Sequence, residues 1–282
     1  MERVRQITRV NEAHKLGYIG NNVTVAVMDT GIGTHIDFGQ RIRGFRDYVG
    51  DKKILYDDNG HGTHVSGIIA GSGFASHGRY RGMAPGAAIY AIKVLDRMGK
   101  GNTRLVVSAL KWLISNYEKM NIRILNISVG MLASARREEQ EELLAAIEAV
   151  WDAGIVVVAA AGNNGPKDKS ITIPGLCRKI ITVGSSDDEE GEVKNLGLMR
   201  GYSGRGPTEA CIMKPEVVAP GTAIVSCKRM GNGYEMKSGT SMATPVVAGA
   251  VAVLLSRYSN LKPAEVKLRL YETSVDLSLI HI

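Results

Sequence analysis

The chain has 282 residues, 44% of them hydrophobic but only 5% aromatic, and it carries a formal net charge of +7. This length suits one large domain or two small ones, and a core with so few aromatic side chains must be mostly aliphatic, as in buried parallel sheets. Lys and Arg are scattered in runs of no more than two, which indicates a solvated surface and neither a nucleic-acid nor a membrane partner.

The cysteine content points to a reducing compartment. Cys177, Cys211 and Cys227 are an odd number and too few for a disulfide framework, so we expect them to be reduced. No Cys-x-x-Cys pair is present, which argues against a thiolate metal site. The N-terminal residues lack the apolar core of a signal peptide, and no apolar run approaches the length of a membrane span. These features predict a cytoplasmic protein.

Strand-like and helix-like segments alternate along the chain. Apolar, β-rich runs predict buried strands at residues 22–31, 87–95, 122–130, 154–163 and 179–186. Helix-like stretches lie between and after them, at residues 61–71, 102–120, 137–154, from 241 onward and at 262–276. This alternation predicts an α/β fold with a mostly parallel sheet and helices on both of its faces. Because we find no repeat, low-complexity tract or linker, we expect a single domain over residues 1–276.

Polar residues follow several of the predicted strands at the point where each strand ends. Asp29 comes after the first apolar run, Asn126–Gly130 close the third, and Gly162–Asn163 close the fourth. Functional groups of parallel sheets gather at the carboxyl ends of the strands. His61, at the start of the predicted 61–71 helix, is expected at the same edge.

Ser241 lies in KSGTSMATPVVAG, residues 237–249, where small residues crowd the start of an apolar helix. One interpretation is a helix cap, since Ser and Thr oxygens accept orphan backbone N–H bonds at helix starts. The other is a nucleophile, placed where helix N–H groups and the helix dipole favour developing negative charge. A serine nucleophile needs a base and an orienting group, which the rest of the chain must supply.

Asp29 and His61 could supply those two groups. Taken alone, an Asp after a strand can cap a turn, and a His such as His61 or His64 can be structural. Gly60 and Gly62, however, flank His61 and leave room for a neighbour to approach. Three such motifs in the order Asp, His, Ser on one edge of a sheet favour nucleophilic catalysis over three separate structural roles.

Eight stretches of the chain together resemble the subtilisin family of serine proteases, the subtilases. They are VAVMDTGIG, NGHGTHVSGIIAG, YAIKVLD, LNISVG, VVVAAAGNNG, YSGRGPT, KPEVVAPG and SGTSMATPVVAGAVAVLL. They cover nearly the whole chain. The resemblance implies a three-layer, subtilisin-like α/β fold and a serine endopeptidase that needs no cofactor.

The resemblance also implies a role for each candidate residue. Ser241 would attack the scissile carbonyl, His61 would take its proton and pass it to the leaving amine, and Asp29 would orient the imidazole. Asn163 and the backbone N–H of Ser241 would donate to the oxyanion of the intermediate. The structural alternative for Asn163 is a turn residue beside a glycine. The expected substrates are polypeptides in an extended conformation.

Residues 98–101 and 128–130 resemble the two edge segments that pair with an extended peptide in this family. Their glycines leave the main-chain hydrogen-bonding groups accessible. The side chain before the scissile bond is expected in a pocket between residues 128–130 and 160–162, whose small apolar walls predict tolerance for apolar side chains. The predicted substrate-binding residues are Gly99, Lys100, Gly101, Ser128, Val129, Gly130, Ala160, Ala161 and Gly162.

The chain departs from the family pattern in two places. Met131 stands where a glycine is frequent, and its bulk would narrow one subsite. Many members carry a calcium site after the helix of the catalytic histidine, but residues 71–82 lack carboxylates here, and hard cations need oxygen ligands. Asp37 alone does not make a site, so no metal is predicted. The Ile173–Pro174 bond lies where relatives often have a cis peptide, with a trans turn as the open alternative.

The end of the chain differs from the family as well. The helical pattern of residues 262–276 breaks off into LSLIHI, residues 277–282, where relatives usually continue with a strand pair and a short helix. These six residues are a translation of CTGTCTCTTATACACATC, which matches a transposase adapter used in sequencing libraries. We therefore expect residues 277–282 to be a non-native tail that replaces the end of the domain, and the alternative is a short apolar last strand.

Two other classes of function stay open as alternatives. A catalytically inactive, peptide-binding pseudo-protease would share the fold, but Asp29, His61, Ser241 and Asn163 are all present. A nucleic-acid binder would need a basic cluster or interleaved aromatic and basic residues, and the chain has neither. The sequence predicts no oligomeric state.

Overall fold

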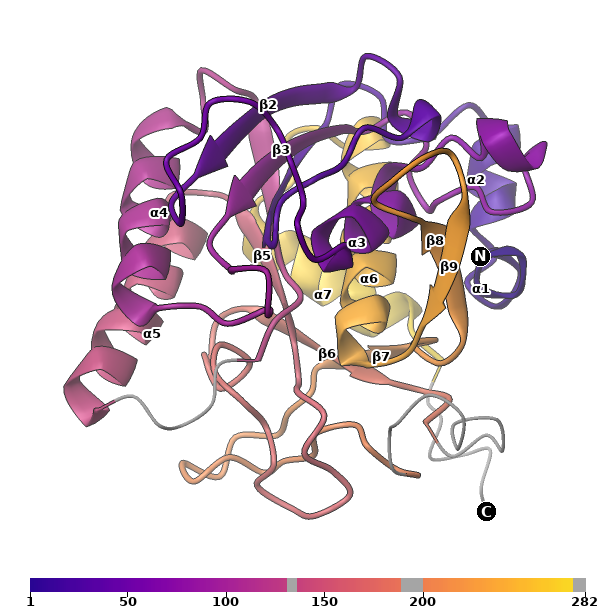
Figure 1. The fold of residues 1–282 in the computed structure, drawn as a ribbon. Helices are drawn as coiled ribbons and strands as arrows, with labels where there is room; N and C mark the ends of the chain where they lie inside the picture. Colours follow the sequence, from indigo (N-terminus) through magenta and orange to yellow (C-terminus); the bar gives the residue numbers. More distant parts are fainter. Residues whose placement is uncertain (131–135, 189–199, 276–282) are drawn as a thin grey trace.

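A seven-stranded sheet lies at the centre of the computed structural model, which describes residues 1–130, 136–188 and 200–275 (Figure 1). Every strand pairing within this sheet is parallel. In spatial order the strands are β2 (Ile42–Asp47), β3 (Ala88–Lys93), β1 (Thr24–Asp29), β4 (Ile122–Ile127), β5 (Val156–Ala160), β6 (Ile181–Ser185) and β7 (Val217–Ala219). The five runs that the sequence predicts as strands are β1, β3, β4, β5 and β6, so the predicted parallel sheet is confirmed.

Helices cover both faces of the sheet, which confirms the predicted three-layer α/β fold. α3 (His61–Ala70) and α6 (Thr240–Arg257) pack against each other, and α6 also lies across β4, β5 and β6. α4 (Thr103–Asn116) and α5 (Arg137–Asp152) form a second pair, at the left of Figure 1, with α5 against β5. α7 (Pro263–Thr273) follows α6 and also contacts β5.

Local sequence signals fix where these helices begin and end. The side chain of Asn102 accepts a hydrogen bond of 2.9 Å from the backbone N–H of Arg104 and so caps α4. Acidic residues occupy the first turn of α5, where the helix dipole favours them, and Gly154 with a φ of 100° follows its last turn. Pro263 opens α7, at a position where a missing backbone N–H costs nothing.

The elements that the sequence analysis missed are short or lie at the edges. β2 reads IRGFRD and has only Asp47 buried, so it lacks the apolar run that marks the central strands. The antiparallel hairpin of β8 (Ile224–Cys227) and β9 (Tyr234–Lys237) contains four-residue strands and packs on α3 through β8. The remaining missed elements are β7, α1 (Glu2–Ile7), α2 (Val10–Lys15) and the 3₁₀ turns η1 (Ile36–Phe38) and η2 (Phe74–Ser76).

α6 is the central core helix of this fold. Among the described residues it alone is long and apolar enough to cross a membrane by length and composition, with a mean hydropathy of 1.3 over 18 residues. In the structure 72% of that stretch is buried inside the protein, because α6 packs against β4, β5 and β6 and also against α3. Its apolar sequence is therefore explained by its place in the core.

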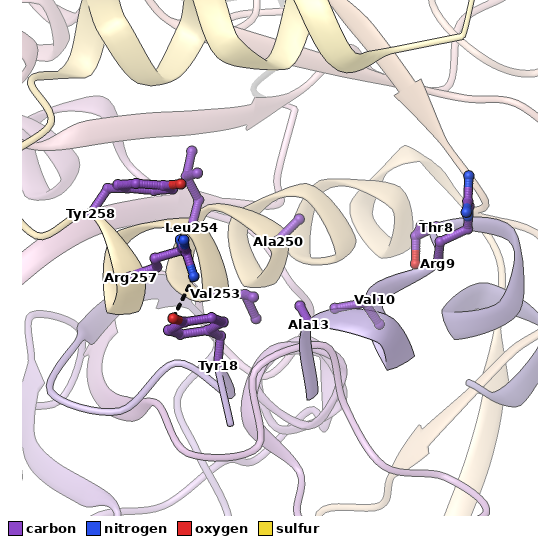
Figure 2. Close-up of a pocket in the computed structure, with 10 residues that line it drawn as sticks. All are labelled: Thr8, Arg9, Val10, Ala13, Tyr18, Ala250, Val253, Leu254, Arg257 and Tyr258. Carbon is purple, nitrogen blue, oxygen red and sulfur yellow. Dashed lines mark hydrogen bonds between the residues drawn. The ribbon is translucent and has the colours of Figure 1, made fainter. Parts of the chain in front are cut away.

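A pocket of about 290 Å³ lies between α2 and the C-terminal end of α6 (Figure 2). Its wall is mostly aliphatic, and the Arg257 guanidinium lies 4.8 Å and 5.1 Å from the ring centroids of Tyr18 and Tyr258. Arg257 also donates a hydrogen bond to the Tyr18 hydroxyl. Ser241 is at the opposite end of α6, about 24 Å away at a rise of about 1.5 Å per residue. The pocket is therefore remote from the predicted catalytic residues.

The close packing around α6 makes Gly249 sensitive to a single methyl group. A Cβ added at Gly249 would lie 2.5 Å from the Cβ of Met83, whereas Gly→Ala in an open helix normally stabilises. We expect Gly249→Ala to lower the free energy of unfolding by about 1–3 kcal/mol through overpacking. Gly233→Ala is the matched control, because a Cβ at Gly233 meets nothing within 4 Å. Denaturant unfolding that shows equal stability for the two variants would contradict this packing.

Candidate active site

The predicted functional residues lie at the carboxyl ends of the strands. Asp29 is the last residue of β1, and Asn163 follows the end of β5. His61 is the first residue of α3 and Ser241 the second residue of α6. β1 has β3 on one side and β4 on the other, so the strand order reverses here. Ligands of open α/β sheets bind at such a switch point.

Asp29 and His61 form a direct side-chain pair. The Nδ1 atom of His61 lies 2.8 Å from Oδ1 and 2.9 Å from Oδ2 of Asp29. Asp29 is fully buried and also accepts a 2.7 Å hydrogen bond from the backbone N–H of Thr30. With Nδ1–H donating to the carboxylate, the other ring nitrogen of His61 is left as the acceptor, which is the tautomer a general base needs.

Opposing influences act on the charge of His61. Burial lowers the pKa of the His61 imidazole, but the charge and the hydrogen bond of Asp29 raise it more, and the net shift is upward. Asp57 adds a smaller upward contribution to this pKa, and Lys237 a smaller downward one. The pair therefore stabilises an imidazolium, as a base that takes up a proton during a reaction requires.

The glycine after His61 allows the two elements to approach this closely. A Cβ at Gly62 would lie 2.2 Å from the carbonyl oxygen of Gly31 and 3.2 Å from the Cβ of Asp29. Any larger residue would push the start of α3 away from the end of β1. The prediction that the flanking glycines leave room for a neighbour is confirmed at this position.

Asp57 is a key residue that the sequence analysis missed. Its Oδ1 accepts from the Thr30 hydroxyl at 2.9 Å and from the Gly60 N–H at 2.7 Å. Its Oδ2 accepts from the N–H and the hydroxyl of Thr63, at 2.9 Å and 2.6 Å. Burial raises the pKa of the Asp57 carboxyl, but these hydrogen bonds outweigh burial and lower it. One carboxylate thus joins the residue after Asp29 to the first turn of α3.

Lys93 is a second residue at the site that the sequence analysis missed. It ends β3 with a fully buried side chain. Its ammonium donates to the carbonyl oxygens of Thr30 and Leu95 and to Oδ1 of Asp58, each at 2.7 Å. The three acceptors belong to the segments that carry Asp29, precede His61 and lead into the predicted peptide-binding edge. The stretch DDNGHGTH, residues 57–64, contains both Asp57 and Asp58, but only the folded chain shows what these carboxylates bind.

Ser241 lies inside α6 and not at its cap. The N-cap position is Gly239, and no side chain makes a capping hydrogen bond there. Among the described residues, the Ser241 hydroxyl makes no hydrogen bond to α6 and none to His61. The capping interpretation of Ser241 is therefore wrong, and the hydroxyl is left available for the nucleophile interpretation, which stays a prediction.

Asn163 holds the start of α6 from outside the helix. Its Oδ1 accepts from the backbone N–H of Thr240 at 2.9 Å and from the Thr240 hydroxyl at 3.0 Å. The Thr240 hydroxyl in turn accepts from the Gly162 N–H at 3.2 Å. Because Thr240 takes both bonds through Oδ1, the Nδ2 group of Asn163 remains as a donor beside Ser241. Asn163 is more than a turn residue, and Thr240 is a positioning residue that the sequence analysis missed.

The predicted peptide-binding edge of residues 99–101 is a tight turn. Its central Lys100 accepts a 2.9 Å hydrogen bond from the Asp96 N–H through its carbonyl oxygen and returns one of 2.9 Å to Asp96 Oδ1. Asn59, in the loop before α3, donates to the carbonyl oxygen of Arg97 at 3.0 Å. The turn is thus attached to the segment that carries His61.

The other two predicted substrate segments lie next to each other. Residues 128–130 follow β4 and residues 160–162 include the end of β5, and these strands are paired neighbours. Ser128 and all of residues 160–162 are buried, whereas Gly130 is exposed. Their side-by-side position agrees with a crevice between them, although its role in binding a peptide stays a prediction.

A sequence profile described as Peptidase_S8, the subtilase family, matches residues 20–281. The chain belongs to the subtilase family. It is 43% identical to the serine protease AprX of Bacillus subtilis (strain 168) over 266 residues, which cover 88% of this chain and 60% of AprX. It is 36% identical to a thermostable alkaline protease of Halalkalibacterium halodurans, covering 94% of this chain and 66% of that protein. The chain therefore spans less than two thirds of these two relatives.

Solved structures of this family share the fold. A cold-adapted subtilisin-like serine proteinase superposes with a TM-score of 0.73 at 31% identity, over 90% of this chain and 82% of the other. Because the match extends over nine tenths of this chain, the subtilisin-like architecture is confirmed.

The structure tests one further family-based prediction, the conformation of a single peptide bond. The Ile173–Pro174 peptide bond is cis, so the predicted cis peptide is confirmed and the trans alternative is wrong. Met131 and the tail of residues 277–282 lie outside the described residues.

Asp37 lies in a buried cluster of three residues whose side chains are of types that can bind a metal ion. Ligand atoms of His35, Asp37 and Cys227 lie within 4.8 Å of one another. The Asp37 carboxylate accepts from the Gly73 N–H at 3.0 Å and from the Tyr234 hydroxyl at 2.9 Å. His35 Nδ1 accepts from the Asp37 N–H at 3.1 Å. These groups are already satisfied by protein donors, so the cluster does not argue for an ion, and the absence of a metal stays a prediction.

An arginine binds the loop that the sequence analysis found poor in carboxylates. The Arg5 guanidinium donates to the carbonyl oxygens of Gly78, Arg79 and Arg81, at 3.3, 3.4 and 2.5 Å. Arg5 is only 8% exposed. A side-chain cation thus satisfies carbonyl oxygens of this loop and attaches α1 to it.

His64 is structural, which settles the alternative left open by the sequence. Its Nε2 lies 3.1 Å from the carbonyl oxygens of both Ile224 and Glu235 and so joins α3 to β8 and β9. Burial lowers the pKa of His64 to about 3, so it is neutral near pH 7. Lys237 ends β9 and pairs with Glu235 at 3.2 Å.

The charge of Lys237 should be visible in the titration of His61. Burial and, more weakly, Lys237 lower the pKa of His61, so Lys237→Met should raise this pKa. Lys237→Arg keeps the charge and should leave this pKa near the original value. NMR titration of the His61 ring measures both, and added salt should shrink the difference. An unchanged or lower pKa in Lys237→Met would show that the two groups do not interact.

Proposed function

We propose that this chain is a serine endopeptidase that hydrolyses extended polypeptides through an acyl-enzyme, with Ser241 as the nucleophile. The observation that carries the proposal is the 2.8 Å pairing of His61 with the fully buried Asp29, on the sheet edge where Ser241 lies in the first turn of α6. Named serine proteases among the relatives support the same activity. The reaction needs no cofactor in this scheme.

Each step of the reaction uses one of the groups described above. The unprotonated Nε2 of His61 takes the proton of Ser241 as its oxygen attacks the carbonyl carbon of the peptide. The imidazolium that forms is stabilised by Asp29, whose charge raises the pKa of His61 against the effect of burial. His61 then protonates the leaving amine, and water repeats the sequence on the ester to release the acid and restore Ser241.

The oxyanion formed in each half-reaction needs two donors. The backbone N–H of Ser241 lies in the first turn of α6, where N–H groups have no acceptor within the helix. The Nδ2 group of Asn163 is the second donor, because Thr240 fixes the amide through its oxygen. Both donors are held before substrate arrives, so no reorganisation is required when charge develops.

The polypeptide substrate would lie between two segments of the chain. Gly99–Gly101 and Ser128–Gly130 would pair with its main chain as added strands do, and the side chain on the acyl side would enter the crevice beside Ala160–Gly162. The non-catalytic alternative, a peptide-binding pseudo-protease, is disfavoured because such a protein has no need of a buried carboxylate paired to a histidine. The three cysteines are unpaired, which is compatible with the predicted cytoplasmic location.

Labelling with a fluorophosphonate tests the nucleophile directly. We expect one covalent adduct on Ser241, located by mass spectrometry, because this reagent needs a serine activated by a neighbouring base. Ser241→Ala should abolish labelling and hydrolysis of an unfolded protein substrate, and His61→Ala should abolish labelling while Ser241 is retained. Labelling at another residue, or none on folded protein, would contradict the mechanism.

Asn163→Ala separates transition-state stabilisation from substrate binding. We expect kcat to fall by about 10²–10³-fold with little change in KM, the size known for loss of the equivalent donor in subtilisin. The donor acts mainly as charge develops, so the ground state is little affected. Thr240→Val is the companion variant, since it removes one of the two bonds that orient Asn163 and should give a smaller loss. A rise in KM at constant kcat would make Asn163 a ground-state contact instead.

A further inference from the structure

A second pocket, of about 750 Å³, lies at the amino ends of the strands, the edge of the sheet opposite the candidate active site. Its walls are residues at the starts of four adjacent strands, β2, β3, β1 and β4, or just before them. Thr24 lines it, and Asp29 is five residues further along β1, about 17 Å away at about 3.3 Å per residue. A pocket of this volume can hold a small organic ligand, and the proposed peptidase reaction makes no use of it.

Three cationic and three amide side chains line this pocket. They are Arg41, Arg43, Lys119, Asn21, Asn22 and Asn121. The described residues that line it include no Asp or Glu. Such a wall offers many N–H donors and three positive charges without a carboxylate to balance them. It therefore favours a ligand that is anionic and accepts hydrogen bonds from several sides.

The three cations differ in how their donors are used. The Arg41 guanidinium donates to three backbone carbonyl oxygens, which fix it in place. The side chains of Arg43 and Lys119 are exposed, and among the described residues they form no ion pair or hydrogen bond. Two charges of the pocket are thus available to a ligand.

The backbone gives Arg43 a special place in β2. Ile42 pairs with Ile89 of β3, and Gly44 pairs with the next residue, Tyr90, so Arg43 is an extra residue in the ladder. β-Bulges of this kind recur beside functional sites, where they redirect a side chain. The irregularity coincides with an arginine that has no partner within the protein.

The cations lie on opposite walls of the pocket. Arg41 and Arg43 lie at the start of β2, whereas Lys119 precedes β4, with β3 and β1 between them. Three strand spacings of about 4.8 Å put these walls about 14 Å apart. The Asn121 side chain donates to the carbonyl oxygen of Asn22 at 2.9 Å and so joins the segment of Lys119 to the loop before β1. A single phosphate or carboxylate is too short to meet both walls, whereas a linear polyanion can do so.

We propose that this pocket binds a small molecule that carries a chain of phosphoryl groups, either an inorganic polyphosphate or the phosphate chain of a nucleotide. Phosphate oxygens accept strong hydrogen bonds from charged donors, and the fork of an arginine matches their geometry. The ligand would connect the start of β2 to the segment before β4 and would stabilise the folded protein by mass action. This binding function goes beyond the proposed peptidase function and does not depend on it.

Inorganic tripolyphosphate is the probe, and isothermal titration calorimetry measures its binding. We expect one site per chain and an affinity that falls as salt is added. Arg43→Gln and Lys119→Gln should each weaken binding by about tenfold or more, the usual effect of losing a hydrogen bond to a charged group. Because both side chains are exposed, the unfolding temperature without ligand should stay unchanged. Lys228→Gln is the matched control, since it removes the same charge from an exposed position outside the pocket.

Four outcomes decide the proposal. Failure to bind tripolyphosphate overturns it, and equal weakening in Lys228→Gln does so too, because attraction would then come from net charge alone. Citrate or orthophosphate binding as tightly as tripolyphosphate would also overturn it, since neither spans the two walls. Tighter binding of ATP supports the proposal with a nucleotide as the ligand, and equal binding supports it with the phosphate chain alone. Ser241→Ala should bind tripolyphosphate unchanged, so a failure of this site and a failure of the peptidase function are observed separately.

Discussion

Keeping the carboxylate of Asp29 satisfied without water is the constraint on which the rest of this site depends. Asp29 is fully buried, and an unpaired charge there would cost several kcal/mol. Its oxygens are served by Thr30 N–H and by the His61 ring, so the end of β1 and the start of α3 must stay within hydrogen-bond distance. The missing side chain of Gly62 makes this approach sterically possible.

Two further charged side chains, Asp57 and Lys93, hold the segments around the Asp29–His61 pair in place. Asp57 binds Thr30 on one side and the first turn of α3 on the other, and Lys93 gathers three acceptors from segments beside the site. Each side chain makes hydrogen bonds, in place of water, with polar groups that are buried near the end of β1. Removing either partner would leave a buried donor or acceptor unsatisfied, which costs more than the hydrogen bond itself contributes. The Asp29–His61 pair is therefore held by the same hydrogen bonds that stabilise this part of the fold.

The sequence predicts what is local and misses what depends on contacts between distant segments. β1 and β5 are buried along their whole length, so their apolar runs identify them, and Asp29, His61, Ser241 and Asn163 stand in short motifs that can be recognised without a structure. β2 alternates with charged residues because it is an edge strand, and it was missed. Thr240 was missed because its bonds to Gly162 and Asn163 join segments that only the fold brings together.

The start of α6 shows why the same sequence signal supports two interpretations. Small polar residues at a helix start normally cap the helix with their own oxygens. Here the N-cap is Gly239, and the cap comes from another segment, since Asn163 accepts the N–H of Thr240. Because the helix end is satisfied from outside, the Ser241 hydroxyl has no acceptor or donor to serve in α6. The bond that caps the helix also orients the Asn163 amide. In the proposed mechanism, this single contact both leaves the Ser241 hydroxyl available and directs a donor toward the charge that its attack would create.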